Sequence, residues 1–422
     1  MRTFTLLVTA LALCSGTLLA QERVPVTPPL TEGDTLGDRT WISVQANVIS
    51  QRAGGNDLSR FADEATSRVA TLYGGFRVTR SLELLGDVEA AGGTGVIVVP
   101  GLGAIPDVDD PAPLAFKDGV YLARAMVHYT IGFGSETELV TRNPLSLASL
   151  VPVRRLEIRA GKLSPIDFFD LNAITSDSHS QFTNTAIVNN GVYDYASDAR
   201  GYTWGAVAEY YSRSWAIRFG EMIIPNASDI NVRWAWSSRR SENVEVESHT
   251  TRLLNRPSVV RALAFVNHKP EATTFGLGLN GEHELSDAWR AFWRIGWNDG
   301  RSTTSNIDES LQIGADTSGR RWHRDADRAG AALVVNGLTM AHRHNLEQLV
   351  GSGFEPFAYR AERAIEAYYN VQVWRGVSMG VAYQVIGYPG YDRDRGVVPV
   401  LGLRLHVEAA IPLTAFTKSR GD

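Results

Sequence analysis

The sequence predicts an all-β fold, a transmembrane antiparallel β-barrel of about 16 strands. Three observations support this prediction. Runs in which apolar residues alternate with polar or small ones recur along most of the chain, as in strands with one wet face. Short and long connections alternate between these runs, as they do in membrane barrels. After residues 1–20 the chain has no apolar run of about 18 residues, so helical membrane spans are excluded.

Residues 1–20 have the pattern of a secretory signal peptide. Arg2 supplies the positive charge, residues 4–13 the apolar core and residues 17–20 a cleavage site. A membrane anchor is the alternative, but the apolar run is too short to span a bilayer. Cys14 is the only cysteine, and a lipoprotein would need a small residue where Leu13 precedes it. We therefore expect a mature chain without disulfides or thiol chemistry.

The composition favours one large sheet over several domains. The length alone would suggest about two or three domains, but no linker-like boundary interrupts the strand patterns. The formal net charge of −5 argues against nucleic acid as a partner. We expect residues 21–38, rich in Pro, Thr and Glu, to form a flexible periplasmic segment. Residues 39–410 are assigned to the barrel and residues 411–422 to a C-terminal tail.

The run at residues 155–162 shows the strand pattern most clearly. Its apolar face carries Leu156 and Ile158, and its charged face carries Arg155, Glu157 and Arg159. The runs at 243–253 and 308–315 are the weakest. Strands are predicted, in order, at residues 39–50, 67–78, 82–91, 118–131, 153–162, 202–211, 214–224, 243–253, 258–267, 273–284, 289–298, 308–315, 327–336, 361–373, 376–387 and 398–410.

The connections predict which side of the membrane each end of the barrel faces. If both termini are periplasmic, the short turns face the periplasm and the long loops face outward. The connection at 132–152 is long and yet periplasmic by parity, and a short helix at 143–150 is one interpretation of it. The short connections are 79–81, 212–214, 255–257, 285–288 and 374–376, and the long ones are 51–66, 92–117, 163–201, 225–242, 337–360 and 388–397.

Strand parity also predicts which side chains point inward. A dry core could not hold so many ionisable groups, so we expect a water-filled lumen. Two alternatives remain: the charges face bulk water on an open sheet or sandwich, or Arg–Glu pairs brace neighbouring strands. Aromatic residues on the other face, among them Tyr121, Trp204 and Trp297, suit interfacial girdles. The candidate pore-lining residues on strands are Arg124, Arg155, Glu157, Arg159, Glu209, Arg218, Arg261, Arg290, Arg294, Asn298, Glu366 and Arg404.

Several motifs occur together in an order that resembles the carbohydrate-selective porin (OprB-type) family. The resemblance covers roughly residues 40–408 and implies an outer-membrane barrel through which sugars diffuse inward. The motifs are Gly161-Lys-x-Ser-x-x-Asp-Phe-Phe-Asp170, Asn190-Gly191, Tyr195, Asp198-x-Arg-Gly-Tyr-Thr-Trp-Gly205, Gly296-Trp-Asn-Asp-Gly-Arg301, Val335-Asn-Gly-Leu338, His342-Arg343 and Tyr391-Asp-Arg-Asp-Arg-Gly396.

We expect the insert at residues 163–201 to be an extracellular loop that folds inward, since such a loop in porins can enter the lumen and narrow it. Asp167 and Asp170 offer planar polar groups that bind sugar hydroxyls, and aromatic faces stack on sugar rings. We therefore count both aspartates as pore-lining. For Phe168 and Phe169 we favour a different interpretation, in which they anchor the loop to the barrel wall.

Catalytic signals are weak. The sequence lacks Gly-x-Ser-x-Gly, His-Glu-x-x-His and a phosphate loop, and we predict no enzyme activity, metal or cofactor. An outer-membrane hydrolase and a soluble, lectin-like secreted protein are less favoured. We expect a passive channel for sugars and small polar solutes in the outer membrane of a Gram-negative bacterium, in contact with its lipid, as a monomer or homotrimer. A general or anion-preferring porin of the same fold is the alternative.

Overall fold

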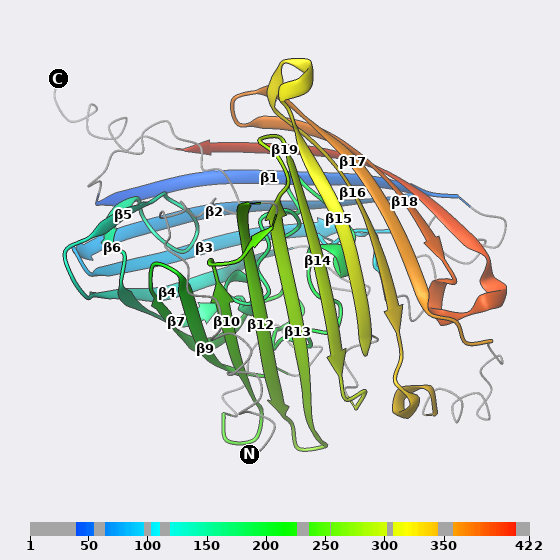
Figure 1. Cartoon of the computed structure of the whole chain (residues 1–422), viewed down its shortest axis with the longest axis horizontal. Coiled ribbons are helices and arrows are strands. Elements are labelled where there is room, and N and C mark those ends of the chain that lie inside the picture. The colour runs from blue at the N-terminus through cyan, green and yellow to red at the C-terminus, as the bar shows by residue number, and fades with distance from the viewer. Residues whose placement is uncertain are drawn as a thin grey trace.

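A barrel forms because each wall strand pairs with the next wall strand along the chain and the last pairs with the first (Figure 1). The computed structural model describes residues 39–54, 64–96, 103–109, 119–225, 236–253, 255–301, 307–344 and 358–410. The predicted signal peptide, the segment at 21–38 and the tail at 411–422 lie outside these residues. The sheet has 17 strands, of which β11 has only 2 residues and pairs with β12 alone, so 16 strands make up the wall.

The wall strands are all antiparallel to their neighbours, and they lie close to the predicted positions. Among the described residues, no helix is both long and apolar enough to cross a membrane. The elements are β1 (Thr40–Ala53), β2 (Glu64–Thr79), β3 (Leu82–Gly93), β4 (Gly119–Gly132), β5 (Thr137–Val140), β6 (Ser149–Pro152), β7 (Arg155–Leu163), η1 (Pro165–Asp167), α2 (Thr185–Val188), β8 (Thr203–Tyr211), β9 (Trp215–Ile223), β10 (Arg240–Ser248), β11 (Arg252–Leu253), β12 (Arg256–His268), β13 (Thr273–Glu284), β14 (Trp289–Asn298), β15 (Glu309–Gly319), η2 (Arg320–Trp322), β16 (Arg324–Gly337), β17 (Glu362–Trp374), β18 (Val377–Gly387), η3 (Pro389–Tyr391), η4 (Arg393–Arg395) and β19 (Val397–Ala410).

The barrel closes where β1 meets β19. The register runs from Ser43 opposite Ala410 to Ala53 opposite Val400. The first residues of β1 and the last residues of β19 therefore lie at the same end of the barrel. That end also carries the short turns β2–β3, β8–β9 and β17–β18. We call it the short-turn end. It faces the periplasm in outer-membrane barrels.

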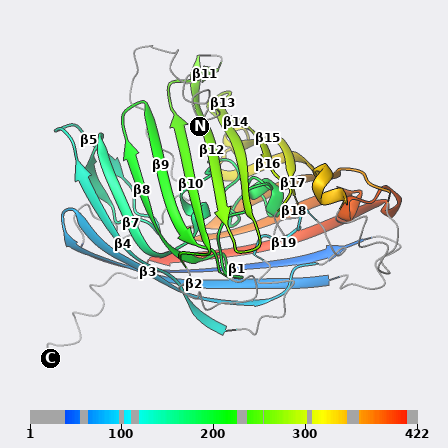
Figure 2. The same ribbon diagram turned by 90° about the horizontal axis from the view of Figure 1, so that it is seen from below.

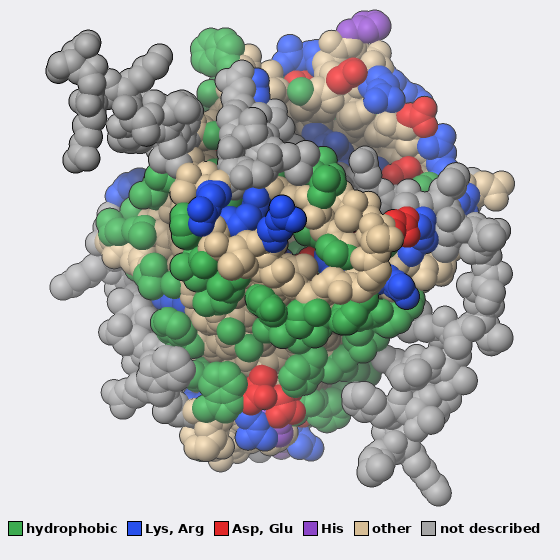
Figure 3. Space-filling model, turned by 90° about the vertical axis from the view of Figure 1, so that its left-hand side faces the viewer, with side chains coloured by type: hydrophobic (Ala, Val, Ile, Leu, Met, Phe, Trp, Pro, Cys, Tyr) green, Lys and Arg blue, Asp and Glu red, His purple; other side chains and the backbone are tan. Residues whose placement is uncertain are grey.

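Alternation along β19 shows why this sequence forms a barrel wall. Leu403 and Leu405 point outward and are 59% and 42% exposed, whereas Arg404 and His406 point inward and are 6% and 7% exposed. In the view of Figure 3, hydrophobic side chains cover a broad band of the outer surface, and charged side chains gather above and below it. An apolar band around a polar interior is what a lipid-embedded barrel requires.

A β-bulge overturns one parity prediction. The pairing of β3 with β4 steps from Asp87 opposite Arg124 to Val88 opposite Leu122, which leaves Ala123 as an extra residue. An extra residue reverses the alternation beyond it. Tyr121 therefore lies on the inner side, 6.2 Å from the buried ring of Tyr202, and the prediction that it faces lipid is wrong.

The long connection between β4 and β7 leaves from the short-turn end, as its parity predicts. The interpretation of 143–150 as a short helix is wrong. The connection instead contains the two-stranded sheet of β5 and β6, and residues between these strands form a tight turn in which Asn143 pairs with Ser146. The physical reason is local, because Asn143-Pro144 favours a turn over a helix.

The insert between β7 and β8 folds into the barrel, where it meets the segment at 103–109. Backbone bonds join the two, from Val108 N to Thr183 O at 2.8 Å and from Thr185 N to Ile105 O at 2.9 Å. Its trace, with the short helix α2, lies within the ring of strands (Figures 1 and 2). Its apolar residues form one buried cluster with inward wall residues. This cluster includes Phe182, Ile187, Val192, Phe292, Val334 and Ile386.

Candidate functional site: the barrel interior

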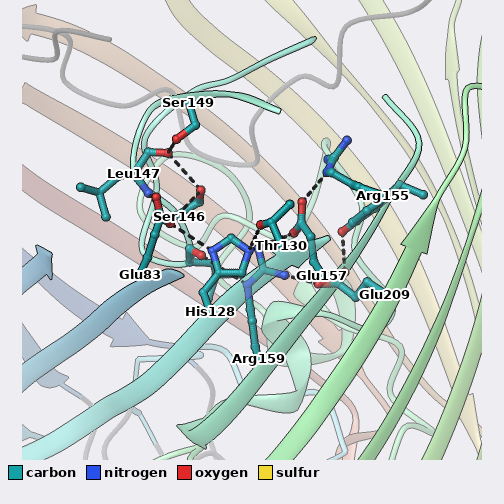
Figure 4. Close-up of polar contacts among 12 residues, drawn as sticks. Glu83, His128, Thr130, Ser146, Leu147, Ser149, Arg155, Glu157, Arg159 and Glu209 are labelled. Atoms are coloured by element: carbon teal, nitrogen blue, oxygen red, sulfur yellow. Dashed lines mark hydrogen bonds and ion pairs between the residues drawn. The ribbon is translucent and has the colours of Figure 1, made fainter. Parts of the chain in front are cut away.

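Charged residues of β7 and β8 form the start of an ion-pair ladder on the inner wall (Figure 4). Arg155 and Arg159 both donate to Glu157, the latter at 2.7 Å, and Arg159 also donates to Glu209. Glu157 lies directly opposite Glu209 in the β7–β8 register. Two carboxylates so placed would repel each other, and the Arg159 guanidinium between them removes that repulsion.

The ladder continues across β9, β10, β12 and β13. Arg218 on β9 donates to Glu209 at 3.1 Å and to Glu245 and Glu247 at 2.9 Å each. Arg261 then donates to Glu247 at 2.8 Å and to Glu282 at 3.1 Å. The strand register dictates these contacts, since Arg218 lies opposite both Glu209 and Glu245, and Glu247 lies opposite Arg261.

The ladder side chains are buried, which bears on whether they contact solute or brace neighbouring strands. A buried charge is tolerated only when partners and hydrogen bonds replace its water. Each buried residue of the ladder has at least one ion-pair partner. These residues are Arg155, Glu157, Arg159, Glu209, Arg218 and Arg261. Their geometry fits the alternative that Arg–Glu pairs brace neighbouring strands, and their contact with a passing solute stays a prediction.

Arg124 joins the wall to the beginning of the insert. Its guanidinium binds Asp167 through Nε at 2.7 Å and Nη2 at 2.8 Å, and it binds Asp87 on β3 through Nη1 at 2.6 Å. The Asp167 side chain stays 18% exposed. A forked pair of this kind fixes both the position and the orientation of the carboxylate.

Arg294 and Asp170 lie at the centre of the insert. Arg294 Nε is 3.1 Å from Asp170 Oδ2, and Arg294 also donates to Ile187 O and Asp170 O at 2.9 Å each. Asp170 accepts from Asn190 N at 2.6 Å. Burial raises the pKa of the Asp170 carboxyl, and the Arg294 guanidinium opposes that shift. Arg294 therefore holds two distant parts of the insert against β14.

Glu366 and Arg404 hold the far side of the insert. Glu366 accepts from Thr183 N at 2.8 Å and Asn184 N at 2.9 Å. Arg404 donates to the backbone oxygens of Ser178 and Gln181, at 2.6 and 2.9 Å. Both side chains thus bind the insert backbone, which lies between them and the centre of the barrel.

Asn298 and Arg290 complete the predicted set. Asn298 donates to Val192 O at 3.2 Å and to Ile307 O at 2.8 Å, so it also holds the insert. Arg290 pairs with Asp316 on β15 and keeps 18% of its side chain exposed. The structure thus separates the predicted residues into a ladder at the short-turn end, anchors for the insert, and a few partly exposed groups.

Acidic residues are the part of the site that sequence reasoning missed. The candidate pore-lining set contains more arginines than acids, but the arginines of the ladder pair with further acids outside that set. In the predicted strand 82–91, alternation places Glu83, Asp87 and Glu89 on one face. The polar character of that face was the signal that could have identified them as inward residues. The missed acids include Glu83, Asp87, Glu89, Glu245, Glu247, Glu282 and Asp316.

The aromatic residues of the insert pack against the wall. Phe168 and Phe169 are buried with Leu163, Val207 and Leu263 in one cluster. Gly220 on β9 leaves the space that Phe169 fills, since a Cβ there would lie 2.9 Å from its ring. The prediction that both phenylalanines anchor the loop is confirmed.

Comparison with known proteins shows a likeness to one family. Residues 277–408 match the model of the carbohydrate-selective porins, OprB family. The match covers about a third of the chain, and over these residues the chain resembles this family. The protein is a porin of the outer membrane, a channel rather than an enzyme. The matched residues include five predicted pore-lining positions, namely Arg290, Arg294, Asn298, Glu366 and Arg404.

Solved porins share the fold of this chain. The high-pH structure of Pseudomonas putida OprB superposes with a TM-score of 0.69 at 12% identity and covers 88% of this chain and 94% of its own. The low-pH structure of the same protein superposes with a TM-score of 0.50 at 10% identity and covers 88% of this chain and 92% of its own. At such identities the likeness establishes the fold alone. No curated protein sequence matches this chain.

Proposed function

We propose that the protein is a passive outer-membrane channel for carbohydrates. The family match at residues 277–408 carries this proposal. The inner face of the barrel agrees with it, because it combines forked guanidinium donors with carboxylate acceptors. Sugar hydroxyls act as both donors and acceptors, so such a surface can replace part of their hydration.

Passage requires no energy source. The wall excludes lipid, and a solute crosses by exchanging water for short-lived contacts with interior side chains. Conduction needs each contact to be weak, so affinity for sugar is expected on the order of millimolar or weaker. The channel acts as a monomer or a homotrimer in this proposal.

The predicted pore-lining residues contribute in two ways. Arg124, Asp167 and Arg290 keep partly exposed side chains and are the members proposed to touch sugar. The buried members set the field inside the barrel and hold the insert that narrows it. The mixed ladder keeps hydrogen-bonding capacity without a strong net field.

A general or anion-preferring porin is the second candidate, and Arg404 favours it. Within the described part of the chain, no carboxylate forms an ion pair with its guanidinium, which binds backbone oxygens instead. A guanidinium without a paired anion attracts small anions through the lumen.

A liposome-swelling series separates the two candidates. Purified protein is placed in vesicles, and swelling is recorded with neutral sugars, amino acids and small anions of similar size. A carbohydrate channel passes neutral sugars faster than amino acids of equal size. Swelling that depends on size alone, or that is fastest with anions, contradicts the proposal.

A further inference from the structure

The connection between β4 and β7 enters the barrel from the short-turn end. Its hairpin, β5 with β6, is tied to the short-turn end of the wall, because Arg155 pairs with Glu138 at 2.6 Å and Arg213 pairs with Glu136. Residues 141–148, which join β5 to β6, turn back towards the inner wall. We call them the inner turn.

The inner turn is a stiff, preformed unit. Asn143 N donates to Ser146 O at 3.0 Å, and Ser146 N donates back to Asn143 O at 3.1 Å. Asn143 Oδ1 accepts from Leu145 N at 2.8 Å, and Pro144 fixes its own φ. Leu147 is therefore presented at a fixed position.

Leu147 fills a hollow in the inner wall. It is 2% exposed and packs with Trp41, Tyr73, Leu85 and Met126. Gly75 on β2 makes the hollow, since a Cβ added there would lie 2.9 Å from Leu147 Cδ1. The wall thus has a seat shaped for this one side chain.

Polar contacts fix the backbone on both sides of Leu147 (Figure 4). Glu83 accepts from Leu147 N at 3.2 Å and is itself bound by Arg77 at 3.1 Å and His128 at 3.0 Å. Arg77 Nη2 donates to Ala148 O at 2.8 Å.

Arg159 extends this attachment towards β7. Its Nε donates to Leu145 O at 3.3 Å, while its other nitrogens bind the ladder carboxylates. The inner turn therefore lies against the inward faces of β1, β2, β3, β4 and β7, and it is tied to the same charges that brace the wall.

We infer that the inner turn is a second constriction of the channel, which limits solute size at the short-turn end. The insert narrows the barrel with a loop that enters from the opposite end, so a solute meets both in series. Leu147 and its seat at Gly75 determine how far the turn reaches into the lumen. This inference rests on the protein being a channel, and it adds a residue-level determinant of size selection to the proposed function.

The hairpin offers a way to remove the inner turn alone. Val140 and Ser149 are paired residues of β5 and β6, so a two-residue Asn-Gly loop can replace residues 141–148 and close the hairpin. A second variant, Gly75→Val, fills the seat and displaces Leu147 without shortening the chain. Gly74→Val is the matched control, because a Cβ at Gly74 has Gly86 O at 3.8 Å as its nearest neighbour.

Single-channel conductance in planar bilayers is the deciding measurement. The shortened hairpin is expected to raise conductance by a factor of about two and to raise the liposome-swelling rate for trisaccharides relative to monosaccharides. Gly75→Val is expected to lower both, because a filled seat pushes Leu147 and the inner turn away from the wall and further into the lumen. Gly74→Val shifts neither. The change in mobility of unheated protein on gels confirms that each variant is folded.

Either folded variant is decisive by itself. If conductance and the trisaccharide ratio stay at the values of the unaltered protein, the inner turn is a wall contact only and the inference fails. The conductance readout uses ions, so it is independent of sugar preference. An unaltered protein that conducts ions but does not pass sugars would refute the proposed function and leave the test of the constriction intact.

Discussion

Arg294→Ala is expected to destabilise the protein more than any exposed arginine substitution. The Arg294 side chain is 0% exposed and is paired with Asp170, which is 2% exposed. Truncation leaves a buried carboxylate without its partner, a loss of about 3–5 kcal/mol for buried pairs. The insert also loses the bonds from Arg294 to Ile187 O and Thr175 Oγ1.

Guanidinium-induced unfolding in lipid vesicles measures this loss. The 10 tryptophans of the sequence provide the fluorescence signal. Arg52→Ala is the matched control, because the side chains of Arg52 and Glu64 are 75% and 68% exposed and surface pairs contribute little. A loss below about 1 kcal/mol for Arg294→Ala would refute the reasoning, since it would mean that Asp170 is solvated after all.

Three further predictions test the lipid face, the topology and a charged pair in the insert. Leu403→Arg, near the middle of β19, should cost about 2–4 kcal/mol in the same unfolding assay, and a tolerated arginine would contradict its lipid-facing position. In intact cells a membrane-impermeant thiol reagent should label Arg393→Cys and spare Arg375→Cys; the reverse pattern would invert the topology. Burial lowers the pKa of His179, but its bond to Asp177 and the nearby carboxylates outweigh this, so the folded pKa is raised above 6.5. His179 therefore stabilises the fold below pH 6.5, and this contribution is lost as the pH rises through the folded pKa. In unfolding curves recorded across this range, the His179→Asn variant should lack this pH-dependent loss of stability.

Strand parity predicted the barrel wall well, because buried and exposed side chains alternate along most of the strands as their polar and apolar residues do. Leu403, Arg404 and Leu405 lie as their period of two requires. The prediction failed at Tyr121, since the bulge at Ala123 has no marker in the residue types around it. A single extra residue reverses a strand without changing its composition.

The interior was less predictable than the wall. Parity placed Arg159 and Arg218 inside, but their partners depend on register between strands, which connection lengths do not determine. The insert was expected to fold inward, yet nothing local shows that Arg294 and Arg404 bind its backbone oxygens. The seat for Leu147 was the least predictable feature of the interior, because it exists only where Gly75 has no side chain.

Block of ion current by neutral sugar tests the central claim most directly. If sugars enter the barrel interior that ions use, raising the concentration of a neutral disaccharide should reduce single-channel current, with half-maximal block on the order of millimolar or weaker. A neutral polymer too large to enter provides the viscosity control. Current that falls no more with the disaccharide than with the excluded polymer would contradict passage of sugars through this interior.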